Sequence, residues 1–210
     1  MTAPTNRRSL LTLYAEAADP TGHAVRIVLA EKEVGADIQY VTAETKPEDL
    51  NHLNPYQQIL TLIDRDLVLY DATIMIEYLD ERYPHPPLMP MDPVSRASNR
   101  QLRQRVAAEL LAVAKDLSSS NAKSAAAAGR VIRDNLHAIA PIFAQRKFFL
   151  SDEYSLVDCC LAPLLWRLPL FGIKLDPEAK PLLKYAEALF TRKAFKMSLS
   201  PAERSYPTVS

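Results

Sequence analysis

A proline-dense segment near the middle of the chain limits the possible folds more than any other feature. It covers residues 84–93, reads PHPPLMPMDP, and holds five prolines in ten residues. Proline lacks a backbone N–H and its ring clashes with the preceding helical turn, so this stretch cannot form a helix and favours extended polyproline geometry. We call it the proline segment and expect it to link two domains, residues 1–83 and residues 94–210.

The first domain is predicted to mix strands and helices. Short apolar runs predict strands at 10–14, 38–41, 60–64 and 67–70, and only Arg65 and Asp66 separate the last two, which is a hairpin spacing. Helices are predicted over 20–33 with Asp19 as cap, shortly after Pro47, and over 73–82 with Thr73 as cap. This βαβαββα order predicts a thioredoxin-like domain with parallel strands first and an antiparallel edge.

The second domain is predicted to be entirely helical. Helical patterns cover about 94–117, 122–145, 155–168, 178–192 and a short piece at 201–205, with a break at 118–121. Ser155 and Asp158 have the spacing of a capping box, in which serine and acidic side chains bond each other's backbone N–H groups at a helix start. The fold class is therefore α/β plus all-α.

Composition excludes several classes of function. Lys plus Arg and Asp plus Glu both number 25, so the chain lacks the basic excess of a general nucleic-acid binder, and we expect no direct sequence-specific contact with nucleic acid. No apolar run is long enough to span a bilayer or to act as a secretory signal, which predicts a cytoplasmic protein without membrane contact. The four histidines and the adjacent Cys159 and Cys160 show no ligand spacing, so neither a metal nor a cofactor is expected.

Several motifs along nearly the whole chain resemble the glutathione-transferase superfamily, and some are closer to one branch of it, the stringent starvation protein A family. The general motifs are Val25–Lys32, Leu53–Pro55, Thr61–Asp64, Glu77–Leu79 and Ser155–Asp158; those of the branch are Tyr78–Pro90, Phe149–Glu153, Ser155–Cys159 and Ala162–Pro169. The resemblance implies the two-domain transferase fold. It also implies a homodimer that regulates transcription by binding the RNA polymerase holoenzyme near its housekeeping sigma factor.

The residues at the expected glutathione site depart from an enzyme's pattern. A transferase of this fold needs a Tyr, Ser or Cys near the start of its first helix to stabilise or supply a thiolate. Asp19 occupies this place, and a carboxylate there would repel a thiolate and raise its pKa. Thr21 and Tyr14 remain as alternative hydroxyl groups.

Two further elements of that site are altered. The family's Val-Pro-Thr-Leu is Ile59-Leu60-Thr61-Leu62 here, so the cis-proline is missing. A cis bond before leucine costs about 3–4 kcal/mol, which predicts either a trans bond with a reshaped pocket or a strained cis bond. The acid–serine pair that grips the γ-glutamyl group is Asp71-Ala72 and lacks the hydroxyl. We therefore expect no catalytic residues and no enzyme activity, with a glutathione transferase or glutathione-dependent reductase as the alternative.

The resemblance implies a partner-binding surface around Pro84, His85 and Pro86, flanked by Tyr83 and Pro87. Prolines lose little entropy on binding, and a histidine offers both a donor and an acceptor. The alternative is a stiff spacer with a solvated histidine. A third possibility is a scaffold or alarmone sensor that forms heterodimers. Asp92 replaces an aromatic residue of the family after this site, which changes the expected pocket.

An arginine stripe follows the proline segment. Arg96, Arg100 and Arg103 are spaced i, i+4 and i+7, so they share one face of the predicted helix 94–117. The stripe could be a solvated face, could contact acidic groups of a partner, or could lie at a dimer interface, because transferase-fold dimers use this helix.

Overall fold

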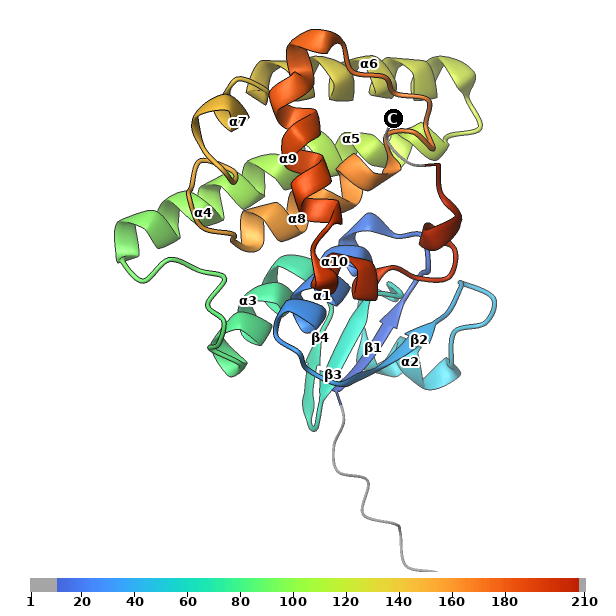
Figure 1. Cartoon of the computed structure of the whole chain (residues 1–210). Coiled ribbons are helices and arrows are strands. Elements are labelled where there is room, and N and C mark those ends of the chain that lie inside the picture. Colours follow the sequence, from blue (N-terminus) through green and yellow to red (C-terminus); the bar gives the residue numbers. More distant parts are fainter. Residues whose placement is uncertain (1–10, 208–210) are drawn as a thin grey trace, which may run out of the picture.

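The computed structural model describes residues 11–207, and Figure 1 shows them in two parts, a small sheet with its helices and a larger bundle of helices. Leu10, expected to begin the first strand, lies outside the described residues. The predicted fold class is confirmed: a thioredoxin-like α/β part is followed by an all-helical part.

Four short strands form one mixed sheet. They are β1 (Leu11–Ala15), β2 (Ala36–Tyr40), β3 (Thr61–Asp64) and β4 (Leu67–Leu69), in the order β2-β1-β3-β4. The β1–β2 pair is parallel, while β3 pairs with β1 and β4 in the antiparallel sense. Arg65 has a φ of 56°, a left-handed conformation that allows the two-residue turn between β3 and β4.

Three helices complete the first part: α1 (Pro20–Glu31), α2 (Glu48–Leu53) and α3 (Ala72–Arg82). Asp19 caps α1, as predicted. The prediction that Thr73 caps α3 is wrong, since the cap is Asp71. Its Oδ1 accepts the N–H groups of Thr73 and Ile74 at 2.8 and 3.1 Å, because Asp71 keeps an extended backbone from which its carboxylate reaches the free amides of the first turn.

The helical part begins with a continuous run over residues 93–118. It consists of α4 (Pro93–Val106), a π-helical turn η1 (Ala107–Leu111), α5 (Ala112–Ala114) and a 3₁₀ turn η2 (Lys115–Ser118). Asn121 then caps α6 (Ala122–Ile139). The single helix expected over 122–145 is interrupted before α7 (Ile142–Gln145), because Pro141 cannot donate the backbone hydrogen bond that would continue it.

Among the described residues, helix α8 (Leu156–Arg167) is the most buried helix of this part, and four short or medium-length helical elements follow it. They are η3 (Pro177–Ala179), α9 (Lys180–Phe190), α10 (Lys193–Ser198) and η4 (Glu203–Ser205); α10 was not predicted, and the expected helix at 201–205 is only the short 3₁₀ turn η4. Helix α1 packs against α3, α8 and α10, so it joins the two parts (Figure 1). Within residues 11–207, no helix combines the length and hydropathy required to cross a membrane.

Candidate functional site

A cleft of about 620 Å³ lies between the sheet part and the helical part. Thr21, Leu60 and Ala72 line it from the first part, and Arg103 and Lys115 line it from the helical run after the proline segment. This is where the sequence pattern places a glutathione site, so its polar groups decide whether thiol chemistry is supported.

Asp19 has both carboxylate oxygens engaged within its own loop. The oxygens accept the backbone N–H groups of Thr21 and Gly22 at 3.1 and 2.8 Å. The Thr21 hydroxyl donates to Asp19 at 2.6 Å, so the alternative nucleophile is hydrogen-bonded to a carboxylate. Burial, together with the charges of Asp19 and Glu44, raises the pKa of the neighbouring Glu16. An added thiolate would meet negative charge on this wall.

The other two altered elements also line the cleft. The Ile59–Leu60 peptide bond is trans, since the cis bond within residues 11–207 is His85–Pro86. The trans alternative of the prediction is therefore the one found. Ala72 opens α3 and has no hydroxyl to offer, while the Asp71 carboxylate caps that helix. Tyr14, the other candidate hydroxyl, lies in β1 opposite Thr61 and is not among the cleft residues.

The two cysteines give no reactive thiolate in this environment. Cys160 lines the cleft, but burial raises the pKa of its thiol to about 12. Cys159 is fully buried, its thiol donates to the Tyr154 hydroxyl at 3.3 Å, and burial raises its pKa as well. Because the thiolate is the nucleophile, these surroundings disfavour nucleophilic chemistry at either cysteine.

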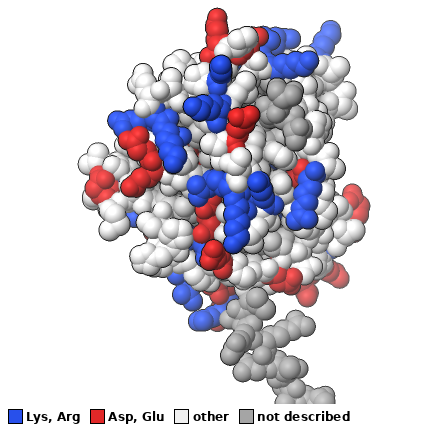
Figure 2. Space-filling view, in the orientation of Figure 1, with Lys and Arg blue, Asp and Glu red and all other residues white. Residues whose placement is uncertain are grey.

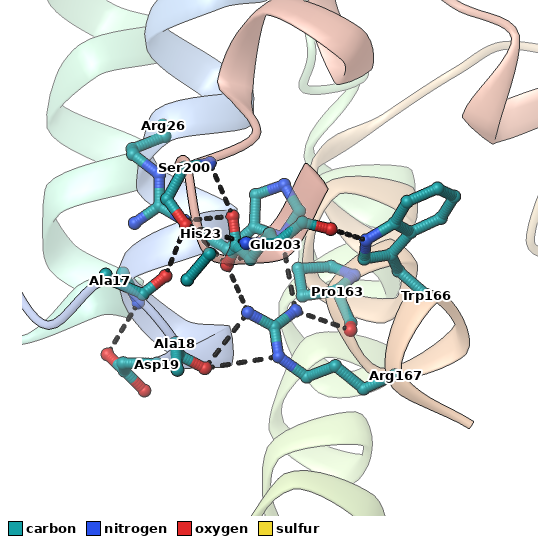
Figure 3. Close-up of polar contacts among 12 residues, drawn as sticks. Ala17, Ala18, Asp19, His23, Arg26, Pro163, Trp166, Arg167, Ser200 and Glu203 are labelled. Carbon is teal, nitrogen blue, oxygen red and sulfur yellow. Dashed lines mark hydrogen bonds and ion pairs between the residues drawn. The ribbon is translucent and has the colours of Figure 1, made fainter. Parts of the chain in front are cut away.

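A buried ionic network lies directly behind the Asp19 loop, and the sequence pattern did not reveal it (Figure 3). We call it the Glu203 network: His23, Arg26, Arg167 and Glu203. Arg26 donates to both carboxylate oxygens of Glu203, at 2.8 and 2.7 Å, and Arg167 donates to one of them. A polar His-x-x-Arg spacing within the apolar α1 was the only available signal.

The same network fixes the backbone of the cleft wall. Arg167 donates to the Ala18 carbonyl at 3.0 and 3.2 Å, and the Ser200 hydroxyl donates to the Ala17 carbonyl at 2.7 Å (Figure 3). Trp166 anchors η4 by donating to the Glu203 carbonyl at 3.0 Å. Arg167 of α8 and Ser200 after α10 therefore both hold the loop before α1.

His23 is neutral within this network. Burial and the charges of Arg26 and Arg167 place its pKa well below the ordinary value. Its Nδ1 accepts from Arg167 at 3.2 Å, so its proton lies on Nε2, which is 2.9 Å from the Ser198 hydroxyl.

The predicted partner surface lies near the C-terminal end of α1, whereas the Asp19 loop lies at its start. Pro84, His85, Pro86 and Pro87 are exposed, while the next two residues, Leu88 and Met89, belong to the hydrophobic core. Tyr83 is half-buried, with the Arg82 guanidinium 5.4 Å from its ring centroid. The proline segment is thus exposed along one side and anchored on the other.

Asp92 has a structural role at the end of this segment. Its Oδ1 accepts the Ser95 N–H at 2.8 Å and caps α4, and this backbone hydrogen bond lowers its pKa. Met91 and Val94, on either side of it, are the two most exposed large apolar side chains of the described residues, at 90% and 76%.

The arginine stripe contacts α3 of the same chain. Arg96 lies 3.5 Å from Glu81 and Arg100 lies 3.0 Å from Glu77, while the buried Arg103 also pairs with Glu77. Although burial opposes it, hydrogen bonds from Arg100 and the charge of Arg103 hold the pKa of Glu77 below its ordinary value. The stripe therefore joins the two parts of the molecule, with Arg96 and Arg100 still partly exposed.

Ser155 and Asp158 form the capping box at the start of α8. Asp158 accepts the Ser155 N–H at 2.8 Å and also the Tyr185 hydroxyl at 2.6 Å and the Phe149 N–H at 3.0 Å. The motif thus fixes three segments of the helical core.

Charge on the molecular surface is mixed. On the face shown in Figure 2, Lys and Arg side chains alternate with Asp and Glu and form no continuous basic band. The described residues also contain no group of three or more His, Cys, Asp or Glu side chains arranged to hold a metal ion.

Comparisons with known proteins agree with this architecture. Models of the glutathione S-transferase N-terminal and C-terminal domains match residues 20–82 and 82–193. The stringent starvation protein A homologs of Coxiella burnetii and Pasteurella multocida are each 44% identical, over 94% and 95% of this chain and 95% and 94% of their own. A glutathione S-transferase structure from Sinorhizobium meliloti 1021 superposes with a TM-score of 0.82 at 22% identity, covering 96% of this chain and 97% of that chain, which supports the fold alone. The chain therefore belongs to the stringent starvation protein A family within the glutathione S-transferase superfamily.

Proposed function

We propose that this chain is a transcription regulator that binds RNA polymerase holoenzyme containing the housekeeping sigma factor, and that it has no transferase activity. The binding surface comprises Pro84, His85, Pro86 and Pro87 with Tyr83 at its edge. The protein acts in the cytoplasm without contacting a membrane or reading a nucleic-acid sequence directly. Family membership supports this assignment of regulator type.

One observation carries the choice of surface. The four residues Pro84–Pro87 are exposed and are followed at once by the buried Leu88 and Met89. Proline rings on an anchored backbone present apolar surface. Because this backbone is already restricted, it loses little further conformational entropy on binding. In the cleft, by contrast, the Thr21 hydroxyl donates to the Asp19 carboxylate, so neither of these two groups at the start of α1 is placed to stabilise a thiolate.

The test is co-purification of holoenzyme with the wild-type chain and with the variant Pro84→Ala/His85→Ala/Pro86→Ala. We expect the wild type to retain polymerase and the variant to lose it while keeping its circular dichroism and thermal midpoint. Pro177→Ala, a change at an exposed proline elsewhere, is the matched control and should retain polymerase. Equal retention by the triple variant would reject this surface.

We propose further that the protein is a homodimer through the face formed by α3 and α4. A surface groove there is lined by Leu67, Ile74 and Tyr78 together with Glu77 and Arg100, and Ile74 is more than half exposed. Native mass spectrometry of wild type and Ile74→Glu tests this directly. A dimer in the wild type that becomes monomeric in the variant is expected, whereas a wild-type monomer would contradict the proposal.

A further inference from the structure

Lys32 is a buried cation at the C-terminal end of α1. Its side chain has 0% exposure, and its ammonium group donates to the Asp80 carboxylate at 2.6 Å. The same group donates to the backbone carbonyl of Pro86. An ammonium is costly to remove from water, so its two oxygen partners are what make this position tolerable.

Asp80, on the last turns of α3, extends these contacts along the proline segment. Its Oδ1 accepts the backbone N–H of Leu88 at 2.8 Å in addition to the Lys32 ammonium. The Leu88 carbonyl in turn accepts the N–H of Leu156, the first residue of α8, at 2.9 Å. Two residues of the first part thus bond the backbone on either side of Pro87.

These contacts determine which side of the segment is exposed. Because the Pro86 carbonyl and the Leu88 N–H both point inward to Lys32 and Asp80, the Pro84, His85 and Pro87 side chains are left at the surface. Well-packed apolar residues could stabilise the same core as well as a buried ion pair does. What an ion pair adds is a fixed direction for the groups that it bonds.

We propose that Lys32 and Asp80 are positioning residues, a buried clasp that holds Pro84–Pro87 in the shape recognised by the partner. This inference rests on the proposed function, because it concerns the same surface. Neither side chain touches the partner, and both act through the backbone of the proline segment. Holding the segment before binding removes an ordering cost that a loose segment would have to meet.

The decisive variant is Lys32→Met/Asp80→Asn. It removes both charges together, so no unpaired charge is left buried, and it keeps side chains of similar size. Lys123→Met, at an exposed lysine, is the matched control for the lysine change. Ile132→Val, a buried change in α6, is the control for a general loss of stability.

Two measurements are made on each variant. The first is affinity for holoenzyme, which we expect to fall about tenfold or more in the double variant and to stay unchanged in both controls. The second needs no partner. Thermolysin cleaves before large apolar residues, and we expect it to cut the double variant before Leu88 faster than the wild type, at a temperature where all variants are folded.

The outcomes separate this inference from the proposed function. Wild-type affinity in the double variant, together with lost binding in the Pro84/His85/Pro86 alanine variant, would overturn the clasp and leave the surface standing. Unchanged binding by the alanine variant would overturn both. An equal loss of affinity in Ile132→Val would show that binding follows stability alone, and would also reject the clasp.

Discussion

The two ends of α1 are both tied by buried charges, but to different effect. Near its start, His23 and Arg26 join the Glu203 network, which is closed to solvent and holds the loop of the transferase-like cleft. At its end, Lys32 pairs with Asp80 directly beneath an exposed proline segment. The first cluster links α1 to α8 and η4, and the second bonds the backbone of the proline segment. The altered cleft and the proposed binding surface are thus contacted by opposite ends of one helix.

The largest expected effect is on the Glu203 network. Glu203→Ala leaves Arg26 and Arg167 buried without their carboxylate, and removing one partner of a buried ion pair costs about 3–5 kcal/mol. Urea unfolding measures this free energy. Glu109→Ala, which removes an exposed ion pair with Arg105, should leave the unfolding midpoint unchanged. If Glu203→Ala lowered the unfolding free energy no more than Glu109→Ala does, the Glu203 network would not be a major source of stability.

The next effect is a dependence of stability on pH that comes from His23. Its folded pKa lies well below 6.5, so the unfolded chain takes up a proton below that pH and the folded protein does not. Stability is therefore present above about pH 6.5 and is lost as the pH falls, by up to about 1.4 kcal/mol per pH unit.

The measurement is the difference in unfolding free energy between wild type and His23→Gln across pH 7.5 to 5.5, a range of about two units. Taking this difference separates the histidine from buried carboxyls such as Asp158, whose raised pKa acts in the opposite sense. His52→Gln, at an exposed histidine, should keep the wild-type slope. A slope that persists in His23→Gln would assign the effect to another group.

A smaller effect is expected at the other end of α1. Lys32→Met/Asp80→Asn removes the pair as a whole, and replacing both partners is often close to neutral, so we expect a loss of about 1 kcal/mol or less. Urea unfolding beside Glu203→Ala gives the comparison directly. If the double variant lost as much stability as Glu203→Ala, the two ends of α1 would not differ in kind.

The smallest effect is expected from glutathione itself. Millimolar glutathione should raise the unfolding free energy by less than about 0.5 kcal/mol, because the cleft has a trans Ile59–Leu60 bond and no hydroxyl at Ala72. Thermal unfolding with and without the tripeptide measures this. Leu60→Pro/Ala72→Ser restores two of the missing features and should respond more strongly. A clear shift in the wild type would favour the transferase or reductase alternative.

The fold could be predicted well because its signals are local. The strand runs, the Arg65-Asp66 turn, the Asp19 cap and the Ser155–Asp158 spacing each act within a few residues. The errors were also local. Asp71, two residues before Thr73, accepts the free amides at the start of α3, and Pro141 follows shortly after the end of α6 at Ile139.

The site could be predicted only in part. The loss of glutathione-binding groups at Asp19, Leu60 and Ala72 is visible in the sequence. The Glu203 network is not, because Arg26 and Glu203 are 177 positions apart and no periodic pattern connects them. The arginine stripe was recognised, but its acidic partners Glu77 and Glu81 lie on another helix, so a face expected to be free or intermolecular is largely engaged within the chain.

Leu88 receives a hydrogen bond from α8 and gives one to α3, so a single residue of the linker is bonded to both halves of the molecule. Such a connection does not behave as a tether, and hinge bending between the halves would have to break it. A protein that bound the neighbouring prolines would therefore be connected to both halves of the molecule through Leu88. In the proposed complex, the orientation of this protein relative to its partner would then be determined by its own fold.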